Sequence, residues 1–200
     1  KRYYRVISQF IIANLSIQIS VILVKSVAII LLGLTNLNSA AQMEIIFRFL
    51  LIAGTLFATI QTVIWPLMSH AEKKRDFKWL KKVKLMLGFG FFTLGLLNVF
   101  IVTFWGDKIF ELWLGNQMIL NHDDIILSSY YFLSIALAQA PIIILMGKGQ
   151  FQIVGRALMV EAVIYTILTT VIYYNYQSIS LSETIIVMII VRLLAFIQLA

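Results

Sequence analysis

Three charged side chains interrupt long apolar stretches of the sequence, namely Lys25, Glu44 and Arg48. A charge at the centre of a membrane helix costs at least ~2.5 kcal/mol, so each of them requires a partner or a polar surrounding. Glu44 and Arg48 are four residues apart and can pair on one helix face, either to fix packing or to serve function. Lys25 has no acidic neighbour on its own helix. It either pairs with another helix or binds an anionic ligand, and we favour the ligand.

These charges belong to two polar helix faces. At 100° per residue, the polar positions of the first helix fall within about 40° and those of the second within about 60°. The first face consists of Asn14, Gln18 and Lys25, and the second of Glu44, Arg48, Thr55, Thr59 and Thr62. A polar face along a whole span points at water, ligand or another polar helix rather than at acyl chains. Two such helices side by side predict an internal cavity, for which these eight residues are the candidate lining.

Other residues give weaker signals. Glu161 is, with Glu44, a candidate for ion coupling, although a carboxylate at headgroup level fits Glu161 equally. Arg192 is expected to extend its side chain towards the membrane surface. Gly88 and Gly95 share one helix face and predict close helix contact, and Pro66 is expected to end its helix.

The composition is that of a polytopic membrane protein. The chain is 61% hydrophobic and 12% charged, with a mean hydropathy of +0.95, whereas soluble domains carry about 25% charged residues. It has no cysteine, which excludes disulfides and thiolate metal sites. No catalytic constellation, metal site or phosphate-binding glycine loop is recognisable, and the adjacent Asp123 and Asp124 are expected in a loop with nothing to act on. We therefore expect no enzyme, no cofactor and no metal.

Six segments approach the roughly 20 apolar residues that a membrane-crossing helix needs. They are Val6 to Gly33, Ala41 to Met68, Val83 to Trp105, Ile125 to Met146, Ala157 to Tyr174, and Glu183 to Ala200. The expected fold is all-α, one bundle of six transmembrane helices over residues 1–200. The chain begins at Lys1 and stops inside an apolar run, so we expect it to be part of a longer chain.

Basic residues set the expected direction of these spans. With a cytoplasmic N-terminus, twelve of the sixteen lysines and arginines fall on the cytoplasmic side, as the positive-inside rule requires. Seven of the twelve lie between Lys73 and Lys84, in a segment expected to be a basic loop against anionic headgroups. Nucleic acid is an improbable partner, because the basic residues stay in short loops beside spans. Both chain ends are therefore expected in the cytoplasm.

Two landmarks support a family resemblance. The first is "VAIILLGLTNLNSAAQMEIIFRF", whose second helix runs into "TVIWPLMSHAEKKRDFKWLKK". The second is "IFELWLG", followed by a span that contains Pro141 and closes with "LMGKGQ". In this order, over roughly residues 6 to 175, the chain resembles the C-terminal half of the polysaccharide (O-antigen or capsule) flippases of the multidrug/oligosaccharidyl-lipid/polysaccharide exporter superfamily.

The resemblance implies two six-helix bundles around a central cavity, of which this chain would be the second. Its expected partners are then the N-terminal half of the same chain, membrane lipid and other polysaccharide-assembly membrane proteins. The implied activity moves undecaprenyl-diphosphate-linked oligosaccharide across the bacterial cytoplasmic membrane by alternating access. Lys25 and Arg48 occupy the kind of position that meets the diphosphate. Family sequences often have an acidic residue or an arginine in the first helix of this half, where this chain has Lys25.

Two other classes compete with a flippase. A cation-coupled multidrug antiporter of the same superfamily would require acidic residues in the cavity, whereas the spans hold more basic than acidic side chains. A membrane polysaccharide polymerase would be expected to have a large outer loop with clustered arginines. The longest outer loop here carries one lysine, Lys108.

Overall fold

The fold is all-α, as expected. The computed structural model describes residues 2–115 and 120–199, without the side chains of residues 2–9 and 53; Lys1 and Ala200 lie outside it. The described residues form six helices: α1 (Arg2–Thr35), α2 (Leu37–Lys73), α3 (Phe77–Leu114), α4 (His122–Gly147), α5 (Phe151–Tyr176) and α6 (Leu181–Leu199). Each of the six is long and apolar enough to cross a membrane. The protein is therefore a polytopic membrane protein with a helical bundle.

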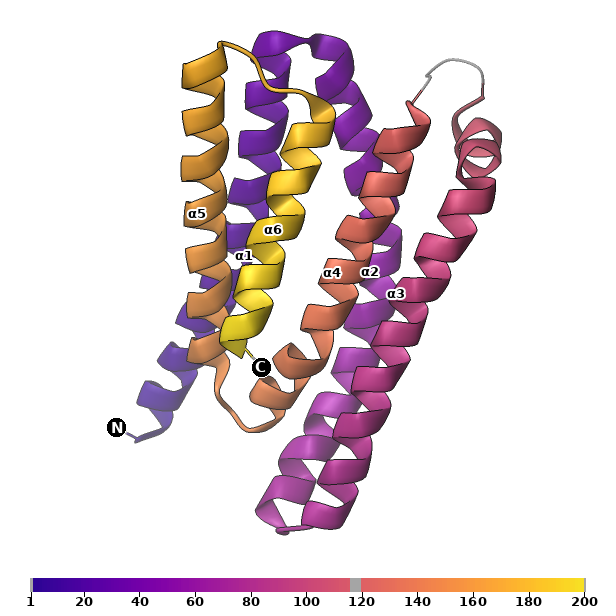
Figure 1. Ribbon diagram of the computed structural model, residues 1–200. Helices are drawn as coiled ribbons and strands as arrows, with labels where there is room; N and C mark the ends of the chain where they lie inside the picture. Colours follow the sequence, from indigo (N-terminus) through magenta and orange to yellow (C-terminus); the bar gives the residue numbers. More distant parts are fainter. Residues whose placement is uncertain (1, 116–119, 200) are drawn as a thin grey trace.

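The helices run alternately up and down, so their connections gather at two ends (Figure 1). The N-terminus, the α2–α3 hairpin and the α4–α5 turn lie at the lower end, and the α1–α2 and α5–α6 connections lie at the upper end. Two of the helices begin at a local side-chain cap. The side chain of Asn36 accepts a hydrogen bond from the backbone N–H of Asn38, and that of Asp76 accepts one from Trp79.

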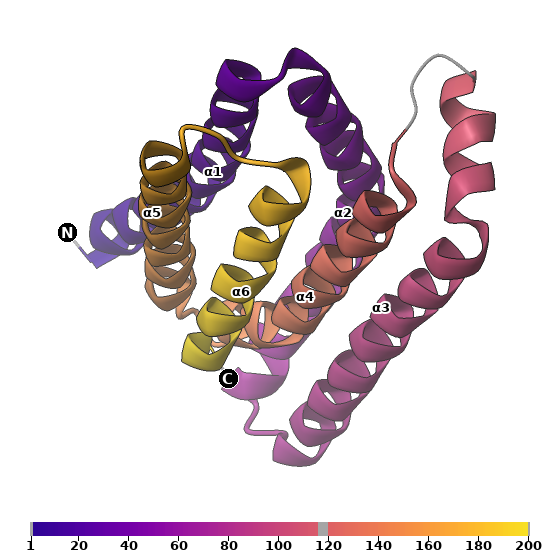
Figure 2. The same ribbon diagram turned by 45° about the horizontal axis from the view of Figure 1, so that its top comes forward.

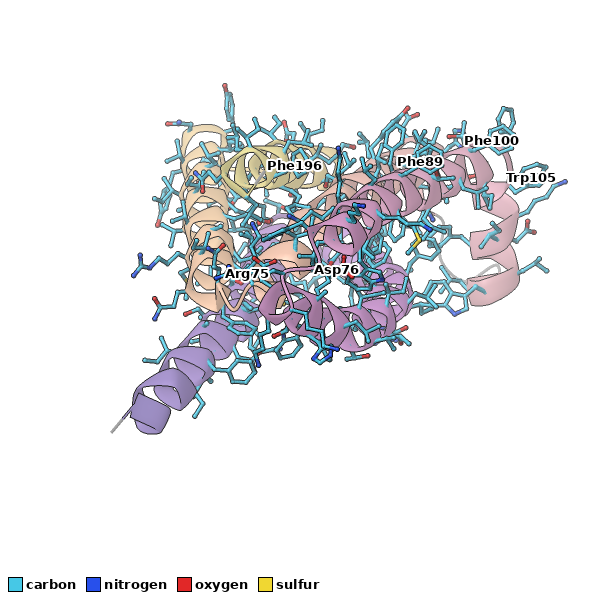
Figure 3. The ribbon with its side chains drawn as sticks, turned by 90° about the horizontal axis from the view of Figure 1, so that it is seen from below. Arg75, Asp76, Phe89, Phe100, Trp105 and Phe196 are labelled. Atoms are coloured by element: carbon cyan, nitrogen blue, oxygen red, sulfur yellow. The ribbon has the colours of Figure 1, made fainter. Side chains whose placement is uncertain are left out.

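The basic segment is a helical hairpin rather than a loop. Helix α2 continues past Pro66 to Lys73, and α3 already begins at Phe77, so the expectation that Pro66 ends its helix is wrong. The helical turn that follows Pro66 is stabilised by Met68, which is buried against Gly147 of α4. Packing from a neighbouring helix is a common way to tolerate an interior proline in a membrane helix. Figure 3 shows Arg75 and Asp76 at the tip of this hairpin.

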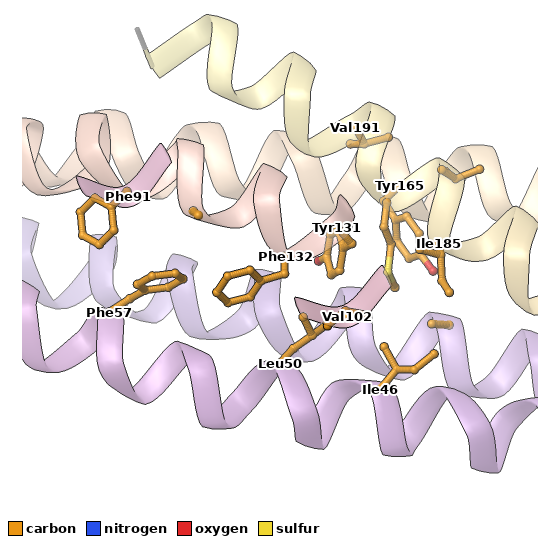
Figure 4. Packing of buried hydrophobic residues seen from close by; sticks show 14 of the residues in the cluster. Ile46, Leu50, Phe57, Phe91, Val102, Tyr131, Phe132, Tyr165, Ile185 and Val191 are labelled. Atoms are coloured by element: carbon orange, nitrogen blue, oxygen red, sulfur yellow. The ribbon is translucent and has the colours of Figure 1, made fainter. Parts of the chain in front are cut away.

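Helix α4 lies at the centre of the bundle, in contact with α2, α3 and α6, whereas α1 packs mainly along α5. Phe57 of α2 stacks on Phe132 of α4 with ring centroids 5.4 Å apart, and meets Phe91 of α3 edge to face at 5.3 Å. Figure 4 shows these rings within the buried cluster. At the upper end the buried Asp124 accepts a 2.6 Å hydrogen bond from the Ser182 hydroxyl, which joins α4 to α6. Asp124 thus lies in the first turn of α4, so the expectation that it lies in a loop is wrong.

Helices α1 and α2 diverge from their shared upper hairpin, and α6 and α4 lie on one side of the resulting V (Figure 2). The two helices approach again at the lower end through an aromatic cluster of Phe10, Trp65 and Phe151, with centroids 5.0 to 6.1 Å apart. The opening between α1 and α2 is therefore bounded above by the hairpin and below by these three rings.

Small residues allow close helix contacts at some of the expected places. A Cβ built on Gly95 would lie 2.5 Å from Leu133 Cδ1 and 3.3 Å from Ala136 Cβ of α4, whereas one on Gly88 would meet nothing within 4 Å. The closest backbone approach is at Gly155 of α5, where a Cβ would lie 3.0 Å from the carbonyl oxygen of Ala13 on α1. Gly95 and Gly155 thus serve packing, and Gly88 has open space.

Gly155→Ala should lower the free energy of unfolding by about 1–3 kcal/mol, because backbone of α1 must move to admit the methyl group. Thermal unfolding of the full chain in detergent measures the effect. Gly88→Ala is the matched control and should leave stability unchanged or raise it by up to ~1 kcal/mol, since alanine favours helix. Equal effects of the two substitutions would contradict the close α1–α5 contact.

The two ends of the bundle should label from opposite sides of the membrane. Because the chain has no native cysteine, single cysteines can be placed without background. In intact cells, a membrane-impermeant maleimide should react with Asn38→Cys and Ser178→Cys, and with Lys74→Cys and Lys148→Cys only after permeabilisation, since the basic end is expected inside. Labelling of one upper and one lower position from the same side would refute six crossings.

Candidate functional site: a membrane-depth cavity with two ion-paired groups

One carboxylate joins two cations across the α1–α2 opening. Lys25 Nζ of α1 lies 3.0 Å from Glu44 Oε2 of α2, and Arg48 Nε lies 3.5 Å from Glu44 Oε1. The Glu44–Arg48 pairing is as expected from their spacing. Of the two alternatives for Lys25, the pairing with another helix is observed, because Glu44 reaches it from α2. The group keeps one positive charge in excess, and its Arg48 side chain is 68% exposed.

Below this group the bundle encloses a cavity of about 340 Å³. Most of its lining is apolar, with polar groups from all five contributing helices: Ser20, Lys25, Gln61, Tyr131, Gln139, Glu161 and Arg192. Lining residues from α4 and α5 are buried except for the half-buried Ile135 and Gln139, whereas Val21 of α1 and Leu51 of α2 are 57% and 64% exposed. The mouth of the cavity therefore lies between α1 and α2.

The remaining members of the two polar faces do not line the cavity. Asn14, Gln18, Thr55, Thr59 and Thr62 are all exposed. In the sequence, Gln18, Arg48 and Thr55 each come directly after a lining residue. The three threonine hydroxyls donate to backbone carbonyls of their own helix at 2.6 to 2.9 Å. The lone pairs of these hydroxyl oxygens can still accept hydrogen bonds. Of the eight residues of the two polar faces, Lys25 alone is among the lining residues.

A second ion pair lies in the cavity wall, between α5 and α6. Arg192 Nη1 is 3.0 Å from Glu161 Oε2, and the two side chains are 15% and 6% exposed. Tyr131 of α4 lines the same cavity and lies within electrostatic reach of both groups. Arg192 therefore does not extend to the membrane surface, because a buried carboxylate binds it inside the bundle.

Sequence reasoning identified Glu161 and missed its partner. Glu161 lies fifteen residues before the end of α5, and Arg192 lies eleven residues after the start of the antiparallel α6. At 1.5 Å per residue the two differ by roughly 6 Å in depth, which long side chains can span. The sequence did contain a signal for this pair, because two opposite charges lie at similar depth in consecutive spans.

Hydrogen-bonding capacity in this wall is not used up by the protein. Glu161 Oε2 is within ion-pair distance of Arg192 but has no hydrogen bond of good geometry, and Arg192 Nε has none within the described part of the chain. Buried polar atoms without a partner cost about 1–3 kcal/mol each. The ion pair therefore leaves hydrogen-bonding capacity unused at the wall of the cavity.

The cavity thus combines a cationic mouth with a neutral polar wall inside an apolar lining. Among the described residues no group of three or more histidine, cysteine or acidic side chains could hold a metal ion. Comparison with protein-family models, curated proteins and solved structures found no match to this chain. The site's chemistry must therefore be inferred from its own geometry.

Arg192→Gln should destabilise the bundle by about 3–5 kcal/mol, because it leaves the Glu161 carboxylate buried without its cation. The double variant Glu161→Gln/Arg192→Gln should recover most of that loss. Thermal unfolding of the full chain in detergent measures both, with Arg48→Gln as the exposed control, expected to cost less than ~1 kcal/mol. If Arg48→Gln destabilised the bundle as much as Arg192→Gln, the buried Glu161–Arg192 pair would contribute no more to stability than the exposed contact of Arg48.

Proposed function

We propose that this chain is part of a flippase of the multidrug/oligosaccharidyl-lipid/polysaccharide exporter superfamily. It carries undecaprenyl-diphosphate-linked oligosaccharide from the cytoplasmic to the outer leaflet of the bacterial cytoplasmic membrane, with both chain ends in the cytoplasm. The observation that carries the proposal is the charge at the mouth of the cavity. There Lys25 and Arg48 share the single carboxylate of Glu44.

A diphosphate is the ligand that this excess of positive charge favours. Moving an anionic head group through hydrocarbon requires a cation at membrane depth and access to water. Lys25 supplies the cation inside the cavity, and the more exposed Arg48 supplies it at the rim. The exposed amides and hydroxyls of Asn14, Gln18 and the three threonines can exchange hydrogen bonds with sugars. Rocking of this bundle against a second one would then present the mouth to each side in turn.

A cation-coupled multidrug antiporter is the second candidate, favoured by the largely aliphatic lining and by Glu161 in the cavity wall. An antiporter must offer a carboxylate to an external cation. The two candidate carboxylates, Glu44 and Glu161, are instead paired with basic side chains of the protein. The flippase therefore ranks first.

Lys25→Ala and Arg48→Ala should each lower the initial rate of translocation about tenfold or more, since each removes a charge-assisted contact with the diphosphate. The assay reconstitutes the full chain in vesicles and follows a fluorescent short-chain polyprenyl-diphosphate glycan between leaflets. Undiminished rates in both variants would refute the assignment.

Glu44→Gln separates binding from packing in the same assay. It removes the carboxylate that Lys25 and Arg48 share, so both cations become more available to the ligand. If the cations bind diphosphate, the half-saturating concentration should stay the same or fall. If Glu44→Gln lowered the translocation rate as much as Lys25→Ala does, Lys25, Glu44 and Arg48 would only hold α1 and α2 together.

A further inference from the structure

The buried wall around Glu161 and Arg192 differs in chemistry from the mouth of the same cavity. At the mouth two cations share one carboxylate, whereas in the wall one carboxylate balances one guanidinium. An ionic ligand gains little net attraction from a balanced pair. The wall therefore suits a neutral ligand that forms hydrogen bonds.

The unused atoms of this wall define the kind of group that fits. Glu161 Oε2 can accept, Arg192 Nε can donate, and neither has a hydrogen-bond partner among the described residues. The Glu161 side chain is only 6% exposed and lines the cavity. Gln139, on the same lining, adds an amide that both donates and accepts. A wall that offers both donors and acceptors suits neighbouring hydroxyl groups, because each hydroxyl donates one hydrogen bond and accepts others.

The space and its apolar surfaces fit one sugar ring. The cavity of about 340 Å³ is at the lower end of the range of small-ligand pockets. Ile135 and Ile142 lie beside the polar wall in the lining, and Tyr131 contributes an aromatic ring. Such surfaces can cover the C–H faces of a pyranose while the polar atoms bind its hydroxyls.

We propose that Glu161, Arg192, Tyr131 and Gln139 form a recognition site for one monosaccharide of the transported glycan. The inference rests on the proposed function and adds to it a subsite inside this bundle, separate from the diphosphate contacts at the mouth. A sugar attached to a diphosphate at Lys25 would reach into the cavity, so that the sugar-bearing lipid binds more tightly than the bare lipid diphosphate.

The test compares two probes on the full chain in lipid nanodiscs. One probe is a fluorescent short-chain polyprenyl diphosphate carrying a single hexose, and the other is the same lipid diphosphate without sugar. The ratio of their dissociation constants reports sugar recognition, whereas binding of the bare lipid reports the mouth. The wild type should prefer the sugar-bearing probe about tenfold or more, as a few new hydrogen bonds allow.

Two variants remove the sugar contacts while keeping the bundle. Gln139→Leu removes an amide with little change in volume. The exchange Glu161→Arg/Arg192→Glu keeps a neutral buried pair but interchanges donor and acceptor positions. Both should lower the preference to near one and leave the dissociation constant of the bare lipid unchanged. Ser128→Ala is the control, since its hydroxyl is buried on the same helix and bonds its own backbone, and it should keep the full preference.

Each outcome decides between the proposals. A preference retained in Gln139→Leu and in the exchange variant would show that the pair serves packing alone and would overturn the sugar site. Equal binding of both probes by the wild type would also overturn it, while leaving the diphosphate role intact. Binding of neither probe would refute the proposed function itself. If the exchange variant does not fold, Gln139→Leu alone decides.

Discussion

The cost of a charge in hydrocarbon governs the arrangement of this bundle. Two carboxylates in the interior of the bundle are paired with basic side chains: Glu44 with Lys25 and Arg48, and Glu161 with Arg192. The first group joins α1 to α2, and the second joins α5 to α6. Because unpaired charges at this depth are strongly unfavourable, these contacts limit how the helices can rotate. They also set the chemistry of the cavity between them, which is cationic at the mouth and neutral in the wall.

The cavity exists because α1 and α2 diverge. Helix α4 fills the centre of the bundle with its aromatic and small residues, and α1 follows α5 through the close contact at Gly155. The V between α1 and α2 is closed below by Phe10, Trp65 and Phe151. In an alternating-access cycle these three rings must separate whenever the mouth opens to the lower side. The outer face of α3 is apolar, as the exposed Phe89, Phe100 and Trp105 illustrate (Figure 3).

The sequence predicted the six helices and the pairing of Glu44 with Arg48, because hydrophobic runs and helical spacing are local properties. It could not predict how far each helix rotates towards the bundle centre. Asn14, Gln18 and the three threonines therefore lie outside the lining. Partners from different helices, such as Arg192 for Glu161, depend on tertiary packing. The continuation of α2 past Pro66 likewise depends on Met68 packing against Gly147, which no local rule contains.

The central claim is that the opening between α1 and α2 is wet and binds an anionic lipid head group. A single cysteine at Leu51, which lines the cavity mouth, measures this directly against one at Phe89 on the apolar outer face of α3. A hydrophilic thiosulfonate should modify Leu51→Cys rapidly and Phe89→Cys very slowly, and a polyprenyl-diphosphate glycan should protect Leu51→Cys from modification. If Leu51→Cys reacted as slowly as Phe89→Cys, or if the lipid gave no protection, the mouth would face acyl chains and the account would be wrong.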